Sequence, residues 1–171
     1  MTERTLNVLF LCTGNSARSI LAEALLNHWG RGRFRGFSAG SMPTGRVNPH
    51  ALELLADMKI PAAGARSKSW DEFAVPGAPN MDIVITVCGN AAGEVCPLWP
   101  GHPLTAHWGV EDPAAVTGTK REVMAAFRHA FDVLQHRVKA LTALPAAPTD
   151  ERARQAWLDE IGRSLPAARS R

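Results

Sequence analysis

The chain has 171 residues, 46% hydrophobic and 20% charged, as in an ordinary soluble globular protein. A single domain of this length needs no disulfide or metal to hold its core, because folding removes about 70% of the unfolded chain's surface from water. The net charge is +3, but the basic residues are spread along the chain apart from a short stretch at residues 31–35. This pattern disfavours nucleic-acid binding and suits a small anionic substrate.

The apolar run at residues 6–11 is far shorter than the roughly 20 residues that cross a bilayer. It also lacks the small-residue cleavage site of a signal peptide. We therefore expect a cytoplasmic protein with no membrane segment. Thiols are kept reduced in the cytoplasm. The three cysteines cannot all pair with one another, so composition leaves their purpose open.

Short apolar runs alternate with amphipathic segments along the chain. Strands are predicted at residues 6–11, 34–38, 81–87 and 104–108. The first and third hold runs of consecutive apolar residues, at 8–11 and 83–85, as in strands buried on both faces. Helices are predicted at residues 19–30, 49–58 and 120–141, where apolar residues recur every three or four positions, with a short helical turn at 67–73. This alternation predicts an α/β fold with parallel strands, right-handed crossovers and helices on both faces of the sheet.

Proline and alanine residues at 144–148 interrupt this pattern. We predict one domain over residues 1–144, followed by an appendage at residues 145–171. Residues 149–162 could form one more helix, for which Trp157, Leu158 and Ile161 would be the apolar anchor.

A cysteine and an arginine, Cys12 and Arg18, frame the turn between the first predicted strand and the first predicted helix. Backbone N–H groups in such a turn, together with the positive end of the helix dipole, form a cradle for a tetrahedral oxyanion. The same field favours the thiolate of Cys12, and the planar guanidinium of Arg18 can hold two anion oxygens. Gly14 is expected to permit the sharp turn, and Ser19 to donate a hydrogen bond to the thiolate. The predicted anion-binding residues are Thr13, Gly14, Asn15, Ser16, Ala17, Arg18 and Ser19.

The string VLFLCTGNSARS at residues 8–19 resembles the signature of the low-molecular-weight protein tyrosine phosphatases and of the arsenate reductases that share their fold. This resemblance covers roughly residues 5–142. It implies a three-layer α/β/α fold with a four-stranded parallel sheet. It also implies that Cys12 is the nucleophile and Arg18 the clamp on the oxyanion. Asp112, followed by Pro113, matches the aspartate that protonates the leaving oxygen in these phosphatases; a positioned general acid is typically worth about 10²–10⁴-fold in rate.

Reductase and phosphatase chemistry both begin with thiolate attack, but reducing arsenic(V) takes two electrons, which two thiols supply by forming a disulfide. Cys88 follows the predicted strand at residues 81–87, and the carboxyl ends of parallel strands share one edge of the sheet. If the two strands are near neighbours, Cys12 and Cys88 could reach bonding distance. Cys96 is separated from Cys88 by seven residues, many of them small, and this segment could reshape so that Cys96 attacks Cys88 and carries the disulfide outward.

The segment at residues 86–97, together with residues 107–109, resembles the reductases specifically. The phosphatases usually place tyrosines after the Asp-Pro pair, whereas Ala114 and Ala115 follow here and the chain has no tyrosine. They also commonly carry a second cysteine before the loop arginine, where this chain has Ala17. The resemblance therefore implies arsenate reduction in arsenic detoxification through a Cys12–Cys88 and then a Cys88–Cys96 disulfide. The alternative is a phosphatase that hydrolyses phosphomonoesters through a cysteinyl-phosphate.

The expected substrate is arsenate, with phosphate and sulfate as competing oxyanions. The electron donor is thioredoxin, which the three cysteines favour, or glutathione with glutaredoxin. No cofactor, nucleic-acid partner or membrane is expected, and relatives of this fold are usually monomers. Some related reductases bind potassium beside the loop; Asn15 and Glu23 match part of that site, but residues 67–69 lack the expected acidic side chain.

A different class of protein, a zinc module, would use Cys88, Cys96, His102 and His107. Its ligand spacing is wider than that of structural zinc sites, and Pro97 and Pro100 interrupt the set. We therefore predict no metal site.

Overall fold

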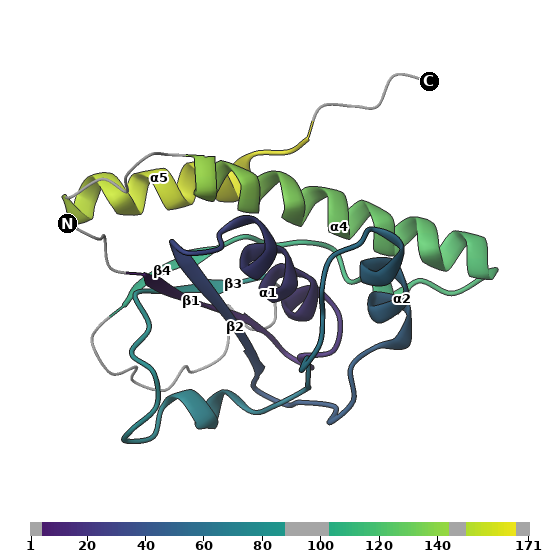
Figure 1. Ribbon diagram of the computed structural model, residues 1–171. Coiled ribbons are helices and arrows are strands. Elements are labelled where there is room, and N and C mark those ends of the chain that lie inside the picture. Colours follow the sequence, from purple (N-terminus) through teal and green to yellow (C-terminus); the bar gives the residue numbers. More distant parts are fainter. Residues whose placement is uncertain (1–4, 88–102, 144–149, 167–171) are drawn as a thin grey trace.

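The computed structural model describes residues 5–87, 103–143 and 150–166 (Figure 1). Its centre is a parallel sheet of four strands in the order β2-β1-β3-β4. The strands are β1 (Leu6–Cys12), β2 (Phe34–Gly40), β3 (Ile83–Thr86) and β4 (Leu104–His107). The sequence prediction of an α/β protein with a four-stranded parallel sheet is therefore confirmed.

Strand β1 occupies a central place, hydrogen-bonded to β2 on one side and to β3 on the other. Its alternate residues Val8, Phe10 and Cys12 belong to the larger hydrophobic core, whereas Leu9 and Leu11 belong to a smaller cluster. Side chains alternate between the two faces of a strand. Both faces of β1 are therefore buried, which explains the run of consecutive apolar residues from Val8 to Leu11.

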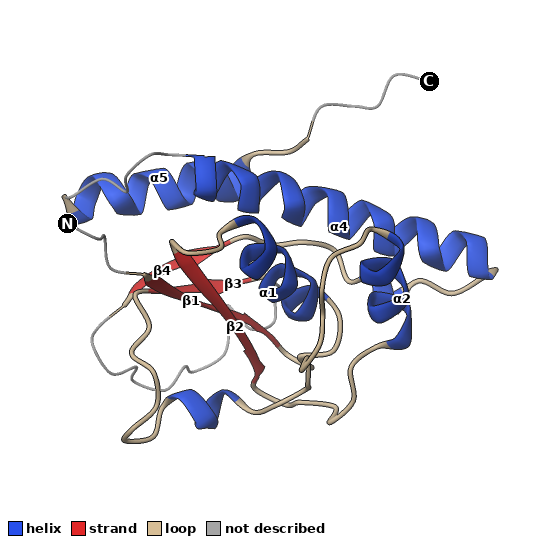
Figure 2. Cartoon of the chain, viewed as in Figure 1, coloured by secondary structure: helices blue, strands red, loops and turns tan. Residues whose placement is uncertain are grey.

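The α-helices of the described residues gather on one face of the sheet (Figure 2). They are α1 (Arg18–Trp29), α2 (Pro49–Asp57), α4 (Lys120–Ala143) and α5 (Glu151–Arg163). Each contributes side chains to the larger core. The smaller cluster on the opposite side of β1 includes Phe73 of the 3₁₀-helix η1 (Trp70–Phe73), which contacts β2.

Local sequence explains where the predicted helices begin and end. Helix α2 begins at Pro49, which tolerates the first helical position, and the side chain of Asn48 caps it by accepting a hydrogen bond from the N–H of His50. Helix α1 ends before Gly30, as predicted. The strand predicted at residues 81–87 is regular only over Ile83–Thr86, and the one predicted at 34–38 continues to Gly40.

Helix α5 packs against β4 and α4. Leu158 and Ile161 are buried in the larger core, and Trp157 packs against it. The indole N–H of the fully buried Trp108 donates to the carbonyl of Leu158 at 3.0 Å. Arg137 of α4 donates to the carbonyls of Ser164 and Gly109, both at 3.1 Å. The division of the chain at residue 144 stays a prediction, but the helix beyond it shares the core of the sheet.

None of the described helices is long and apolar enough to cross a membrane.

Candidate active site

The turn from β1 to α1 directs its carbonyl oxygens to one side. The oxygens of Thr13, Gly14 and Ser16 accept hydrogen bonds from backbone N–H groups of residues 42–48 at 2.9 to 3.0 Å. The described residues contain no cis peptide bond, so each C=O points opposite to the N–H of the residue that follows. The N–H groups that follow these oxygens therefore point to the other side of the turn. Several N–H groups on one side of a turn make a concave site for an anion.

The first turn of α1 lies at the end of this cradle. Its N-cap residue is Ala17, and no side chain caps the helix. Alanine has no side-chain acceptor, so it cannot cap the N–H groups of the first turn. These donors and the positive end of the helix dipole remain for a bound oxyanion.

A chain of hydrogen bonds orients the groups around Cys12. The backbone N–H of Lys68 donates to Oδ1 of Asn15 at 2.9 Å, which fixes the orientation of the amide because an N–H can only donate. Asn15 therefore presents its NH₂ group to Oγ of Ser19 at 2.8 Å. Since the Ser19 oxygen accepts this bond, its own hydrogen is available for the sulfur of Cys12, 2.9 Å away.

This network is well shielded from water. Asn15 and Ser19 are fully buried and Cys12 is 3% exposed. A hydroxyl that donates to sulfur stabilises the thiolate over the thiol. The geometry thus agrees with the role that the sequence predicts for Ser19.

Arg18 joins the loop to the segment after β4. Its Nη1 donates to the carbonyl of Val110 at 2.9 Å, and its Nη2 lies 3.5 Å from Oδ2 of Asp112. The other oxygen of Asp112 accepts a hydrogen bond from the N–H of Ala114 at 3.0 Å and caps the 3₁₀-helix η2 (Pro113–Ala115). The structure therefore brings together the predicted clamp and the predicted general acid, which are 94 residues apart in the sequence.

The predicted relay cysteines Cys88 and Cys96 lie outside the described residues. Strand β3, which leads to Cys88 in the sequence, is the direct neighbour of β1, as the sequence argument required. The last described residue of that segment, Val87, donates its N–H to the carbonyl of Leu11 at 2.8 Å. Leu11 immediately precedes Cys12.

Among the loop residues it is Asn15, with φ of 45°, that adopts the left-handed conformation, and not Gly14. Asparagine tolerates this region better than most residues with a side chain. Gly14 has a milder constraint, since a Cβ atom there would lie 3.2 Å from Cγ2 of Thr44.

Two further residues of the site were missed by the sequence reasoning. Gly40, at the end of β2, lies so close to the loop that a Cβ atom would stand 2.4 Å from the carbonyl oxygen of Thr13. Its position after the second predicted strand was the only available signal. For Lys68, which holds Asn15, no local sequence pattern indicates this role.

The residues beside the loop do not fit a bound potassium ion. The Asn15 oxygen already accepts the N–H of Lys68, and the Glu23 carboxylate accepts the hydroxyl of Ser38. The Lys68 ammonium lies 3.5 Å from that same hydroxyl oxygen. A second cation among these oxygens would be repelled by the ammonium.

The zinc alternative draws on residues that the structure mostly does not describe. Cys88, Cys96 and His102 fall outside the described residues. Nδ1 of His107 is hydrogen-bonded to Oγ1 of Thr86 at 2.7 Å. Within residues 5–87, 103–143 and 150–166, no group of three or more His, Cys, Asp or Glu side chains could hold a metal ion.

A parallel sheet with a Cys-x5-Arg anion cradle at the end of its central strand defines a class of cysteine-dependent enzymes that act on tetrahedral oxyanions. The family model for low molecular weight phosphotyrosine protein phosphatase matches residues 7–153. The chain belongs to this family.

Proteins similar to this chain include arsenate reductases. The arsenate reductase of Shouchella clausii is 37% identical over 132 residues, which span 77% of this chain and 91% of that protein. The arsenate reductase of Bacillus subtilis is 36% identical with the same coverage. The crystal structure of the arsenate reductase from Archaeoglobus fulgidus aligns with a TM-score of 0.63 and 28% identity, covering 80% of this chain and 99% of that one.

Two more solved structures bear on the comparison. The thioredoxin-dependent arsenate reductase of Corynebacterium glutamicum aligns with a TM-score of 0.59 and 26% identity, over 82% of this chain and 62% of that one. A low molecular weight protein tyrosine phosphatase from T. tengcongensis has a TM-score of 0.63 at 21% identity, over 81% of this chain and 99% of that one. The second likeness concerns the fold alone.

Proposed function

We propose that this chain reduces arsenate to arsenite in arsenic detoxification, with Cys12, Cys88 and Cys96 acting in turn. The relatives named as arsenate reductases support the reaction. The observation that carries the proposal for the relay is the hydrogen bond from Val87 to Leu11. It joins the segment that leads to Cys88 to the strand that ends at Cys12, at the sheet edge where ligands of open α/β sheets bind.

In the first step the Cys12 thiolate attacks arsenic. The N–H groups of the loop and the guanidinium of Arg18 hold the arsenate oxygens and stabilise the charge of the transition state. A sulfur–arsenic bond forms and an arsenic–oxygen bond breaks. Asp112 supplies the proton with which that oxygen leaves as water. Arsenic remains in the +5 state throughout this step.

In the second step Cys88 attacks the sulfur of Cys12. A disulfide forms, the sulfur–arsenic bond breaks, and its electron pair stays on arsenic, which leaves as arsenite in the +3 state. Cys96 then attacks Cys88, which transfers the disulfide to the Cys88–Cys96 pair and frees the Cys12 thiolate. The two electrons thus come from two protein thiols, and an external thiol donor must restore them.

Thioredoxin is the donor that we favour, because a Cys88–Cys96 disulfide suits a dithiol reductant and the Corynebacterium glutamicum relative is thioredoxin-dependent. Glutathione with glutaredoxin would instead resolve the adduct on Cys12. Either donor requires a reducing compartment, for which we propose the cytoplasm. In this scheme the chain acts as a monomer, and phosphate and sulfate compete for the cradle.

Hydrolysis of phosphomonoesters is the alternative function, because Cys12, Arg18 and Asp112 would serve it equally well. The residues after Pro113 favour the reductase. Ala114 and Ala115 are small and exposed, and they offer no aromatic surface for a phosphotyrosine ring.

The test combines two substrates with two cysteine variants. Cys88→Ser should stop arsenate-dependent oxidation of thioredoxin while it retains hydrolysis of a small aryl phosphate, which serves as the internal control for an intact loop. Cys96→Ser should release one equivalent of arsenite and accumulate a Cys12–Cys88 disulfide, visible by peptide mass spectrometry. Native arsenate turnover in both variants with either donor system would refute the relay. Loss of aryl phosphate hydrolysis in Cys88→Ser would show that the substitution damages the loop itself.

A further inference from the structure

Lys68 is a buried lysine, with 7% of its surface exposed. Its Nζ donates to the carbonyl of Arg66 at 2.9 Å and approaches Oγ of Ser38 at 3.5 Å. The Ser38 hydroxyl donates to Oε1 of Glu23 at 2.9 Å. A buried ammonium is costly unless polar groups of opposite charge surround it. Lys68 therefore sits in a polar cluster that joins α1, β2 and the segment before η1.

Burial and the neighbouring opposite charge act in opposite directions on the pKa values of Lys68 and Glu23. Burial lowers the pKa of the Lys68 ammonium, while the nearby Glu23 carboxylate raises it. Burial likewise raises the pKa of Glu23, and Lys68, Ser38 and Arg66 lower it. Each charged group therefore makes the charged state of the other less costly.

The main chain at Lys68 is bonded to both the loop and the sheet. Its N–H holds Oδ1 of Asn15, and its carbonyl accepts the N–H of Gly40 at 2.9 Å. The neighbouring Ser67 donates its hydroxyl to the carbonyl of Gly14 at 3.1 Å. The ammonium thus anchors the short segment that orients Asn15, and Asn15 in turn orients Ser19 toward Cys12.

We propose that Lys68 is a positioning residue that supplies a built-in cation beneath the anion cradle. Its ammonium neutralises Glu23 and fixes the segment that aligns Asn15 and Ser19 on the Cys12 sulfur. The role that a bound monovalent cation could fill is thereby internal to the chain, so turnover is independent of potassium. This inference rests on the loop chemistry of the proposed function, but not on arsenate being the substrate.

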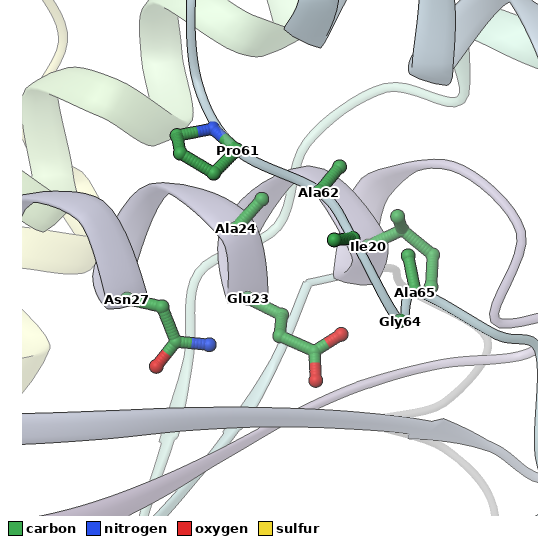
Figure 3. A pocket seen from close by; sticks show the side chains of 9 residues that line it. Ile20, Glu23, Ala24, Asn27, Pro61, Ala62, Gly64 and Ala65 are labelled. Atoms are coloured by element: carbon green, nitrogen blue, oxygen red, sulfur yellow. The ribbon is translucent and has the colours of Figure 1, made fainter.

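A cavity beside the cluster provides a route by which a cation from solution could reach Glu23. Glu23 lines a cavity of about 250 Å³ between α1 and residues 61–65 (Figure 3). Its other wall residues, which the figure shows with Glu23, include Ile20, Ala24 and Asn27. A cation from solution could enter here and reach the Glu23 carboxylate once the lysine side chain is removed.

The experiment compares Lys68→Ala with Lys68→Met in buffers where choline replaces potassium at constant ionic strength. Arsenate reduction and aryl phosphate hydrolysis are both measured. The unsubstituted protein should show the same rates with either ion. Lys68→Ala should lose about tenfold to a hundredfold without potassium, as expected for a displaced catalytic group, and should recover most of that loss with it. Lys68→Met should lose the same activity without recovery, because its side chain fills the space without charge.

A second readout reports on Cys12 directly. In a Cys88→Ser/Cys96→Ser background, Cys12 is the remaining cysteine, and its alkylation rate against pH measures the thiolate. Lys68→Ala should shift the midpoint of this profile upward in choline and back in potassium. The matched control is Lys120→Ala, which removes an exposed lysine paired with Glu53 and should change neither profile nor rate.

The outcomes separate this inference from the proposed function. Unchanged alkylation and aryl phosphate hydrolysis in Lys68→Ala would overturn the positioning role. Activation of the unsubstituted protein by potassium would overturn the claim that the cation is built into the chain. A Lys68→Ala variant that potassium does not restore would overturn the cation role. An absence of arsenate reduction, with the alkylation pattern as expected, would refute the reductase and leave Lys68 as the positioning residue.

Discussion

Gly40, at the end of β2, lies very close to the backbone of the loop between β1 and α1. A Cβ atom there would lie 2.4 Å from the carbonyl oxygen of Thr13, 2.9 Å from that of Cys12 and 3.0 Å from the N of Asn15. All three are backbone atoms of the loop, so no flexible side chain can move aside. Gly40→Ala must therefore displace the loop itself.

The displacement can be estimated from the structure. Moving the Thr13 oxygen from 2.4 Å to an ordinary contact of 3.4 Å takes about 1 Å. A misplacement of about 1 Å at a catalytic group can cost on the order of a hundredfold in rate. Overpacking of this kind typically costs about 1–3 kcal/mol in the free energy of unfolding. We expect Gly40→Ala to remain folded and to lose about a hundredfold in kcat/KM.

The assay measures kcat/KM for arsenate and for an aryl phosphate, together with unfolding by denaturant. Gly36→Ala is the matched control, because it lies on the same strand and its Cβ would stand 3.0 Å from the carbonyl of Glu23 in α1, away from the loop. It should lose stability but keep most of its activity. A Gly40→Ala protein with near-native kcat/KM would show that the loop accommodates the methyl group and that the close approach has no functional consequence.

Three other predictions concern charged groups of the site. Arg18→Lys should keep the fold and lose most turnover, because a point charge cannot reproduce the planar contacts to Val110 and the anion; near-native turnover would remove Arg18 as the clamp. Asp112→Asn should slow the attack of Cys12, measured by single-turnover kinetics, by about 10²–10⁴-fold, while the affinity for sulfate stays unchanged. An unchanged rate would exclude Asp112 as the general acid. Burial raises the pKa of Glu23 above 4.5, so the folded state holds its proton more tightly and the free energy of unfolding falls as pH rises above 4.5. Glu23→Gln should remove this decrease in the free energy of unfolding, measured by urea titration at several pH values. The same pH dependence in the variant and the unsubstituted protein would contradict the raised pKa of Glu23.

Much of the site could be predicted from short stretches of sequence. A continuous apolar run predicts a doubly buried strand, and the helix after it follows from three- and four-residue spacing, so Cys12 and Arg18 are placed by local patterns alone. The predicted partners Ser19 and Asp112 take positions that suit their predicted roles. The predicted roles of Cys88 and Cys96 stay predictions, since both residues lie outside the described part of the chain.

The fold class and the cysteine–arginine turn could be predicted from the sequence, because strand burial, helix periodicity and the geometry of a strand-to-helix turn depend on neighbouring residues. Three features required the three-dimensional structure: the left-handed conformation of Asn15, the lack of space for a side chain at Gly40, and the hydrogen bond that joins Lys68 to the loop. Lys68 is 53 residues from Asn15 in the sequence. Such contacts are created by the packing of segments that are distant in the chain, and no local pattern records which distant residue will fill the space beneath a loop.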